Sequence, residues 1–118
     1  MSDYHFTLPF PPSINTLRAC VRGRMITSKK GREYFDAVKT QMNALGLCDE
    51  RIDRPVVISL VMHPRTLAKF DVSSYLKAYE DALVKCGFLV DDHWIEYGSI
   101  KKGDKIKGGE LVVSVNLK

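Results

Sequence analysis

Three aspartates and a lysine have the types and the spacing of a site that binds a metal ion and a phosphate. Asp71 precedes a helical pattern, Lys77 lies within it, and Asp91 and Asp92 follow the glycine turn that ends it. A helix that ends in such a turn returns the chain, so we expect the paired aspartates to lie near Asp71. Gathered carboxylates repel unless a cation joins them, and magnesium prefers oxygen ligands. The stretch predicts a Mg²⁺ site, with Mn²⁺ also possible, at Asp71, Asp91 and Asp92.

Each of these residues also has an ordinary structural interpretation. Asp71 alone is typical of a helix N-cap, whose carboxylate accepts hydrogen bonds from free backbone amides. Asp91 and Asp92 alone are typical of a solvated turn, and Lys77 alone is typical of the surface. What favours chemistry is their combination within one stretch, residues 70–92.

The helix that must position these residues is predicted by apolar side chains at three- and four-residue spacing. They are Leu76, Tyr79, Leu83 and Cys86. Ser73, Lys77 and Asp81 recur four residues apart and therefore share another face. Gly87 follows where a helix C-terminus favours a residue with positive φ.

Basic residues flank this stretch and are candidates to bind phosphate groups. They lie in a hairpin expected within 17–28, in the first turn of a helix expected over 29–45, and in a loop before Asp71. Ser28 is the expected N-cap of that helix. The candidates are Arg22, Arg24, Lys29, Lys30, Arg32, Arg65 and Lys69. The helix dipole disfavours cations in a first turn, which indicates either a phosphate-facing use or a merely solvated charge run. In a phosphodiester site the cations hold the phosphate and the carboxylates hold the metal.

The remaining pattern predicts a small sheet. Strands are expected at residues 4–8, 55–63, 94–100 and 110–117. The nearly continuous apolar run of 55–63 predicts a central strand that is covered on both faces or lies at an interface. Strands and helices in this order favour an α+β two-layer domain, with a mixed sheet of about four strands and two main helices.

Composition bounds the class of protein. The 118 residues suit one domain, 1–118, and the net charge of +4 suits a polyanionic partner without requiring one. No apolar run reaches the ~18 residues of a membrane span, and no signal pattern opens the chain, so a cytoplasmic protein is expected. Cys20, Cys48 and Cys86 are too far apart for a CxxC zinc pattern and are expected to be buried, reduced thiols.

The stretch 70–92 resembles the signature of the RusA-type Holliday junction resolvases, small phage-associated endodeoxyribonucleases. The residues in register with that signature are Asp71, Lys77, Asp81-Ala82-Leu83, Gly87-Phe88 and Asp91-Asp92. The likeness extends to the segments 8–15, 21–32 and 107–115, nearly the whole chain. It departs at Ser73 and Ser74, where the family usually has Asp and Asn.

The resemblance implies a homodimeric, Mg²⁺-dependent endonuclease that resolves Holliday junctions or other branched DNA. Asp71 and Asp92 are then expected to be catalytic metal ligands, and Asp91 is expected to be a further ligand or to hold the ligands in place. Lys77 is expected to stabilise charge on the phosphate or on the leaving oxygen. His93, next to these acids, is a candidate general base. Asn15 matches a family position near the active site, although an Asn that holds a turn explains it equally well.

The departure at Ser73 motivates a second hypothesis. A serine hydroxyl is a neutral and weaker magnesium ligand than a carboxylate. On this second hypothesis, the chain is a branched-DNA binding protein with weak or no nuclease activity. Either Asp91 or a water replaces the missing carboxylate, or the site is impaired.

Overall fold

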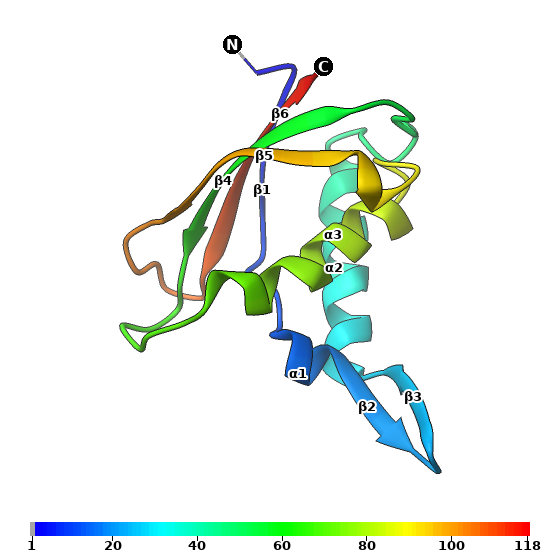
Figure 1. The fold of residues 1–118 in the computed structure, drawn as a ribbon, viewed down its shortest axis with the longest axis vertical. Coiled ribbons are helices and arrows are strands. Elements are labelled where there is room, and N and C mark those ends of the chain that lie inside the picture. Colours follow the sequence, from blue (N-terminus) through cyan, green and yellow to red (C-terminus); the bar gives the residue numbers. More distant parts are fainter. Residues whose placement is uncertain (1) are drawn as a thin grey trace.

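A four-stranded mixed sheet forms one layer of the computed structural model, which describes residues 2–118 (Figure 1). Its strands are β1 (Tyr4–Leu8), β4 (Val56–His63), β5 (Ile95–Lys102) and β6 (Glu110–Leu117). The spatial order is β1-β6-β4-β5, with β4 parallel to β5 and β6 antiparallel to both of its neighbours. The predicted mixed sheet is confirmed.

Helices on one face of the sheet form the second layer (Figure 1). The two main helices are α2 (Lys29–Ala44) and α3 (Leu76–Lys85), and the 3₁₀ helix Val72–Tyr75 runs directly into α3. A second 3₁₀ helix, Asp92–Trp94, precedes β5. The α+β two-layer prediction is therefore confirmed. None of the helices within residues 2–118 has the length and apolarity to cross a bilayer.

The central strand, β4, shows which face of the sheet is covered. Val56, Ile58, Leu60 and Met62 are fully buried, while the residues between them are only half-buried. Side chains alternate between the faces of a strand, so the helices bury one face of β4. The prediction that this strand is covered on both faces is therefore wrong within residues 2–118. The alternative, an interface at its outer face, stays a prediction.

A hairpin that lies between β1 and α2 in the sequence projects from the body of the molecule (Figure 1). It consists of β2 (Arg18–Val21) and β3 (Arg24–Thr27), and it confirms the hairpin expected within 17–28. Cys20 on β2 is exposed, so the expected burial is wrong there, whereas Cys86 is buried as expected. Both turn residues have positive φ, +51° at Arg22 and +77° at Gly23, as a type I′ turn requires.

The base of the hairpin is anchored to the helical layer. The short helix α1 (Ile14–Leu17) precedes β2. Ser28 caps α2 as predicted: its Oγ accepts a hydrogen bond from the Gly31 amide at 3.0 Å and donates one to the Thr16 carbonyl at 2.5 Å. A Cβ at Gly31 would lie 2.8 Å from the Leu17 carbonyl oxygen, so only glycine allows this close approach.

The turn after α3 depends on Gly87, whose φ is +96°. A Cβ there would lie 2.1 Å from the carbonyl oxygen of Cys48. Gly46, after α2, has a φ of +73° but open space around it. Gly87 therefore combines two constraints, a left-handed backbone and a backbone contact, whereas Gly46 has only the first.

We predict that Gly87→Ala lowers the free energy of unfolding by at least about 3 kcal/mol, because backbone strain and overpacking add. The matched control Gly46→Ala carries only the left-handed penalty and is expected to cost about 1 kcal/mol. Urea unfolding of both variants measures the difference. Equal losses at the two positions would contradict the close contact at Cys48.

Candidate active site

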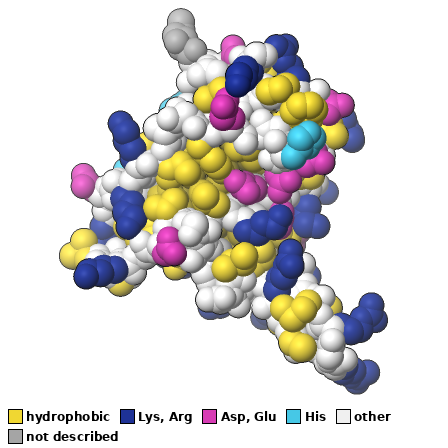
Figure 2. All heavy atoms as spheres, in the orientation of Figure 1, with side chains coloured by type: hydrophobic (Ala, Val, Ile, Leu, Met, Phe, Trp, Pro, Cys, Tyr) yellow, Lys and Arg dark blue, Asp and Glu magenta, His cyan; other side chains and the backbone are white. Residues whose placement is uncertain are grey.

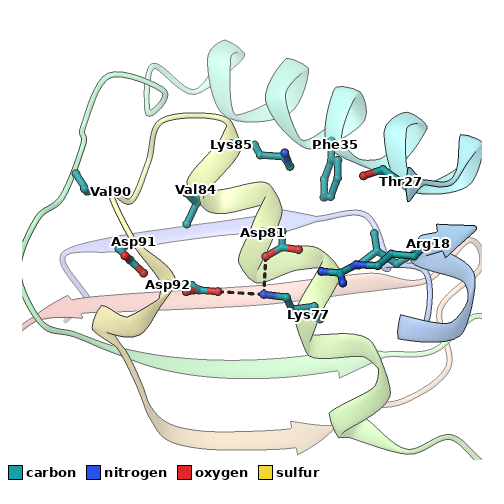
Figure 3. Close-up of a pocket in the computed structure, with 11 residues that line it drawn as sticks. Arg18, Thr27, Phe35, Lys77, Asp81, Val84, Lys85, Val90, Asp91 and Asp92 are labelled. Atoms are coloured by element: carbon teal, nitrogen blue, oxygen red, sulfur yellow. Dashed lines mark hydrogen bonds and ion pairs between the residues drawn. The ribbon is translucent and has the colours of Figure 1, made fainter. Parts of the chain in front are cut away.

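A cavity of about 460 Å³ lies between α3, the base of the hairpin and the segment 90–92 (Figure 3). Its walls carry both signs of charge together with apolar side chains such as Phe35 and Val84. The charged lining residues are Arg18, Lys77, Asp81, Lys85, Asp91 and Asp92. Segments that are distant in sequence therefore place cations and carboxylates in one depression.

Lys77 lies at the centre of these charges, between two carboxylates (Figure 3). Its Nζ is 3.0 Å from Asp81 Oδ1, one turn further along α3, and 3.5 Å from Asp92 Oδ2, beyond the Gly87 turn. The hydrogen bond that Lys77 donates to Asp81 is the main cause that raises the pKa of Lys77, and the charge of Asp92 adds to it. The ammonium group therefore remains charged at neutral pH.

The paired aspartates are positioned by a short parallel bridge and a cap. Leu89 forms an isolated parallel bridge with Ile52. The next residues enter the 3₁₀ helix Asp92–Trp94, whose N-cap is Asp91. The hydrogen bond from the His93 amide, at 3.0 Å, is the main cause that lowers the pKa of Asp91. Asp91 is thus both a cap and a lining residue of the cavity.

His93 lies outside this cavity. Its Nδ1 is 3.1 Å from Asp91 Oδ1, and its ring packs on Trp94 with centroids 4.2 Å apart. The structure therefore places His93 beside one of the predicted metal ligands rather than at Lys77. Its role as a general base stays a prediction.

Asp71 caps the 3₁₀ helix Val72–Tyr75, as the ordinary interpretation suggested. Its Oδ1 accepts hydrogen bonds from Ser73, at 3.3 Å from the amide and 3.0 Å from the hydroxyl. Asp71 is exposed and does not line the cavity that contains Lys77, Asp91 and Asp92. Within residues 2–118, no three His, Cys, Asp or Glu side chains are grouped to hold a metal ion. The three-aspartate metal site stays a prediction.

The predicted DNA-binding residues on the hairpin and α2 are exposed. Arg22 and Arg24 lie at the hairpin tip. Arg32 donates to the Thr27 carbonyl at 2.7 Å, and Lys29 pairs with Glu33 at 3.9 Å. They belong to the surface that extends from the cavity along the hairpin.

The other predicted DNA contacts lie towards the opposite end of α3. Lys30 and Arg65 line a second hollow, of about 410 Å³. Lys69 lies on the loop before Asp71, and Asn15 is exposed on α1. All of the predicted DNA-binding residues lie outside the lining of the Lys77 cavity.

Three residues at or near the site were not proposed from the sequence. Asp81 and Lys77 are spaced i, i+4, and this spacing is a signal that could have paired them. Arg18 carried no signal beyond its basic segment. Glu80 accepts a hydrogen bond of 2.6 Å from the Tyr97 hydroxyl, which also bonds to Tyr79. Only tertiary structure brings Tyr97 of β5 to α3.

The carboxyl group of Glu80 makes the stability of the folded protein depend on pH. Burial raises the pKa of its carboxyl, the hydrogen bond from Tyr97 opposes this, and the charge of Asp92 raises the pKa further. The folded protein therefore binds the Glu80 proton more tightly than the unfolded chain. Stability from this group is present below the ordinary pKa of glutamate and is lost as the pH rises through the raised pKa of the folded state.

We predict that Glu80→Gln stabilises the protein more at about pH 7 than at about pH 3.5, because the amide avoids burying a charge. Urea unfolding at both pH values measures the change, with Glu33→Gln as the exposed control. A Glu80→Gln effect that is independent of pH would contradict the burial of the charged form.

Known proteins match this chain over nearly its whole length. The family model described as Endodeoxyribonuclease RusA matches residues 9–117. The chain is 34% identical over 115 residues to "Crossover junction endodeoxyribonuclease rusA" of Enterobacteria phage 82, which covers 98% of this chain and 95% of the relative. It is also 34% identical over 119 residues to "Crossover junction endodeoxyribonuclease RusA" of Escherichia coli (strain K12), with the same coverage.

Proposed function

Because this chain belongs to the endodeoxyribonuclease RusA family, we propose that it is a Mg²⁺-dependent endonuclease that resolves Holliday junctions and other branched DNA. One observation supports this most directly. Lys77 is held between Asp81 and Asp92 in a cavity that Arg18 also lines, so a cation for phosphate and a carboxylate for metal occupy one site.

The donor set fits the proposed metal. Asp71, Asp91 and Asp92 offer only carboxylate oxygens, and Mg²⁺ usually takes one or two carboxylates together with waters. Asp91 and Asp92 line the cavity, and Asp71 is the third proposed ligand. When bound, Mg²⁺ or Mn²⁺ would polarise the scissile phosphate and lower the pKa of a water.

Lys77 would stabilise negative charge on the phosphate. An ammonium group has three donors, and Asp81 and Asp92 engage two of them, which leaves one for a phosphate or leaving oxygen. Arg18 enters the cavity from β2, and its guanidinium can bind a neighbouring phosphate through two parallel hydrogen bonds (Figure 3). The exposed basic residues of the hairpin, α2 and the loop 64–69 would hold the DNA arms.

The proposed partner set is a second copy of the chain and a DNA junction, in the cytoplasm of a bacterial or phage-infected cell. A four-way junction has two-fold symmetry, so symmetric incision needs two sites related by the same symmetry. The half-buried outer face of β4, which no helix within residues 2–118 covers, is available for such an interface.

Ser73 favours one alternative, a branched-DNA binding protein with weak or no nuclease activity. Its hydroxyl donates to Asp71 at 3.0 Å, where the usual family pattern has a second carboxylate. This contact ties up one oxygen of a proposed ligand. The alternative predicts tight binding of junctions without cleavage.

We predict that Asp92→Asn lowers Mg²⁺-dependent cleavage of a synthetic four-way junction by at least about a hundredfold, because it removes a charged metal ligand. Binding of the junction is retained or becomes tighter, because the substitution also removes repulsion against DNA. Asp36→Asn, which removes the same charge from an exposed position on α2, is the control. Cleavage at the parent rate by Asp92→Asn would refute the site, and tight binding without cleavage by the parent would favour the alternative.

We predict that Ser73→Asp folds and cuts at a lower Mg²⁺ concentration than the parent, because it adds a carboxylate beside Asp71 and suits a helix start. A titration of cleavage rate against Mg²⁺ measures the shift. Ser73→Ala, which removes the hydroxyl contact without adding charge, is the control. An unchanged metal dependence would place position 73 outside the site, and cleavage only in Ser73→Asp would establish that the parent is a binding protein.

A further inference from the structure

The β2–β3 hairpin exposes apolar side chains that no other part of the described chain covers. Met25 is 65% exposed, Val21 47% and Ile26 42%. Figure 2 shows hydrophobic and basic side chains side by side on this arm, at the lower right of the view. An isolated two-stranded hairpin is marginally stable in water at best, so its exposed apolar residues are a cost that a bound partner can offset.

The register of the hairpin shows which of these side chains face the active site. Arg18 pairs with Thr27, and Cys20 pairs with Met25. Cross-strand partners share a face, and positions two apart on a strand return to that face, so all four lie on one side. Arg18 and Thr27 both line the Lys77 cavity. Met25 therefore belongs to the face of the hairpin that is turned towards the cavity.

The other exposed apolar residues belong to the opposite face. Ala19 pairs with Ile26 and Val21 pairs with Arg24. Each of these pairs is shifted by one residue along the strands from the pairs that face the cavity. Met25 and Ile26 are thus neighbours in sequence, are both exposed and apolar, and point to opposite sides of the same ribbon. This pair provides a matched comparison within one element.

The position of Met25 fits a contact with bases close to the cut. Its partner Cys20 is two residues beyond Arg18, so Met25 lies about 7 Å further out along the hairpin. Successive base pairs are about 3.4 Å apart, so this corresponds to about two base steps from a phosphate held at Arg18.

The charges of the hairpin point to DNA as the occupant. Arg18 lies at the base on the same side as Met25, Arg22 lies at the tip, and Arg24 lies on the opposite side, so groups that bind phosphate flank the exposed apolar side chains on both sides of the ribbon. A two-stranded ribbon fits a DNA major groove, and apolar wedges such as Met separate base steps in other DNA-binding proteins. Arg22 also occupies a positive-φ position where Asn or Gly is favoured, a strain that a phosphate contact would explain.

We propose that the cavity-facing side of this hairpin is a wedge that enters the branch point of a bound junction, with Met25 against the unstacked bases. The proposal rests on the proposed function and adds a role that phosphate binding does not supply. A branch point interrupts base stacking, so separating bases there costs less than within a continuous duplex. The anchored base of the hairpin holds the wedge at a fixed distance from Lys77.

The test uses a four-way junction that carries 2-aminopurine, an adenine analogue that fluoresces more strongly when unstacked, next to the branch point. Binding is measured with metal chelated, so that the junction stays uncut. The parent and Ile26→Thr are expected to raise the fluorescence, and Met25→Thr is expected to lose this rise. Thr suits a strand, so both variants keep the hairpin. Affinity for an unbranched duplex is expected to be equal in all three, since phosphate contacts determine it.

The outcomes separate the wedge from the function on which it rests. If the parent binds the junction without a rise in fluorescence, or if Met25→Thr keeps the rise, the wedge is refuted and the nuclease proposal stands. If both variants lose the rise, the assignment of faces is refuted. If Met25→Thr changes the oligomeric state in sedimentation, Met25 belongs to an interface between copies and not to a wedge. If the parent does not prefer the junction over a duplex, both proposals fail.

Discussion

The reversal of the chain at Gly87 is the constraint on which the site depends. Gly87 is in contact with the Cys48 carbonyl, and the next residues form the bridge to Ile52. This brings the Asp92 carboxylate beside Lys77, which lies 15 residues earlier in the sequence. The Lys77 ammonium group therefore lies between Asp92 and Asp81. The lysine and its two carboxylates thus come from one helix and one turn, and the rest of the fold holds that turn in place.

Two of the aspartates are caps of 3₁₀ helices, and one of them also lines the cavity. Asp91 accepts a hydrogen bond from the His93 amide and also lines the cavity. Asp71 caps its 3₁₀ helix in the same manner, through Ser73. A capping bond engages one carboxylate oxygen and fixes the direction of the other. At Asp91 the structure shows the cap and the position on the cavity wall, and its role as a metal ligand stays a prediction.

Local patterns predicted most of the fold, and contacts between distant segments account for what they missed. The two main helices, the Ser28 cap and the Gly87 turn follow from residues near one another in sequence, and each is confirmed. Sheet order, the bridge at Leu89 and the Tyr97 bond to Glu80 depend on tertiary packing, which no local pattern contains. The same limit applies to the site: the sequence predicted that the paired aspartates return near Asp71, whereas the structure brings Asp92 to Lys77 and leaves Asp71 outside the lining of their cavity.

The position of β6 in the sheet has a consequence for how the chain folds. β6 pairs with β1 on one side and β4 on the other, so Leu111 is beside both Leu8 and Met62. β1 has no partner until a segment about a hundred residues later is available. Such long-range pairing slows folding, and a nascent chain that has not yet produced β6 exposes the apolar edges of two strands. Assembly of this nuclease fold is therefore expected to be completed after synthesis of its last strand rather than progressively along the chain.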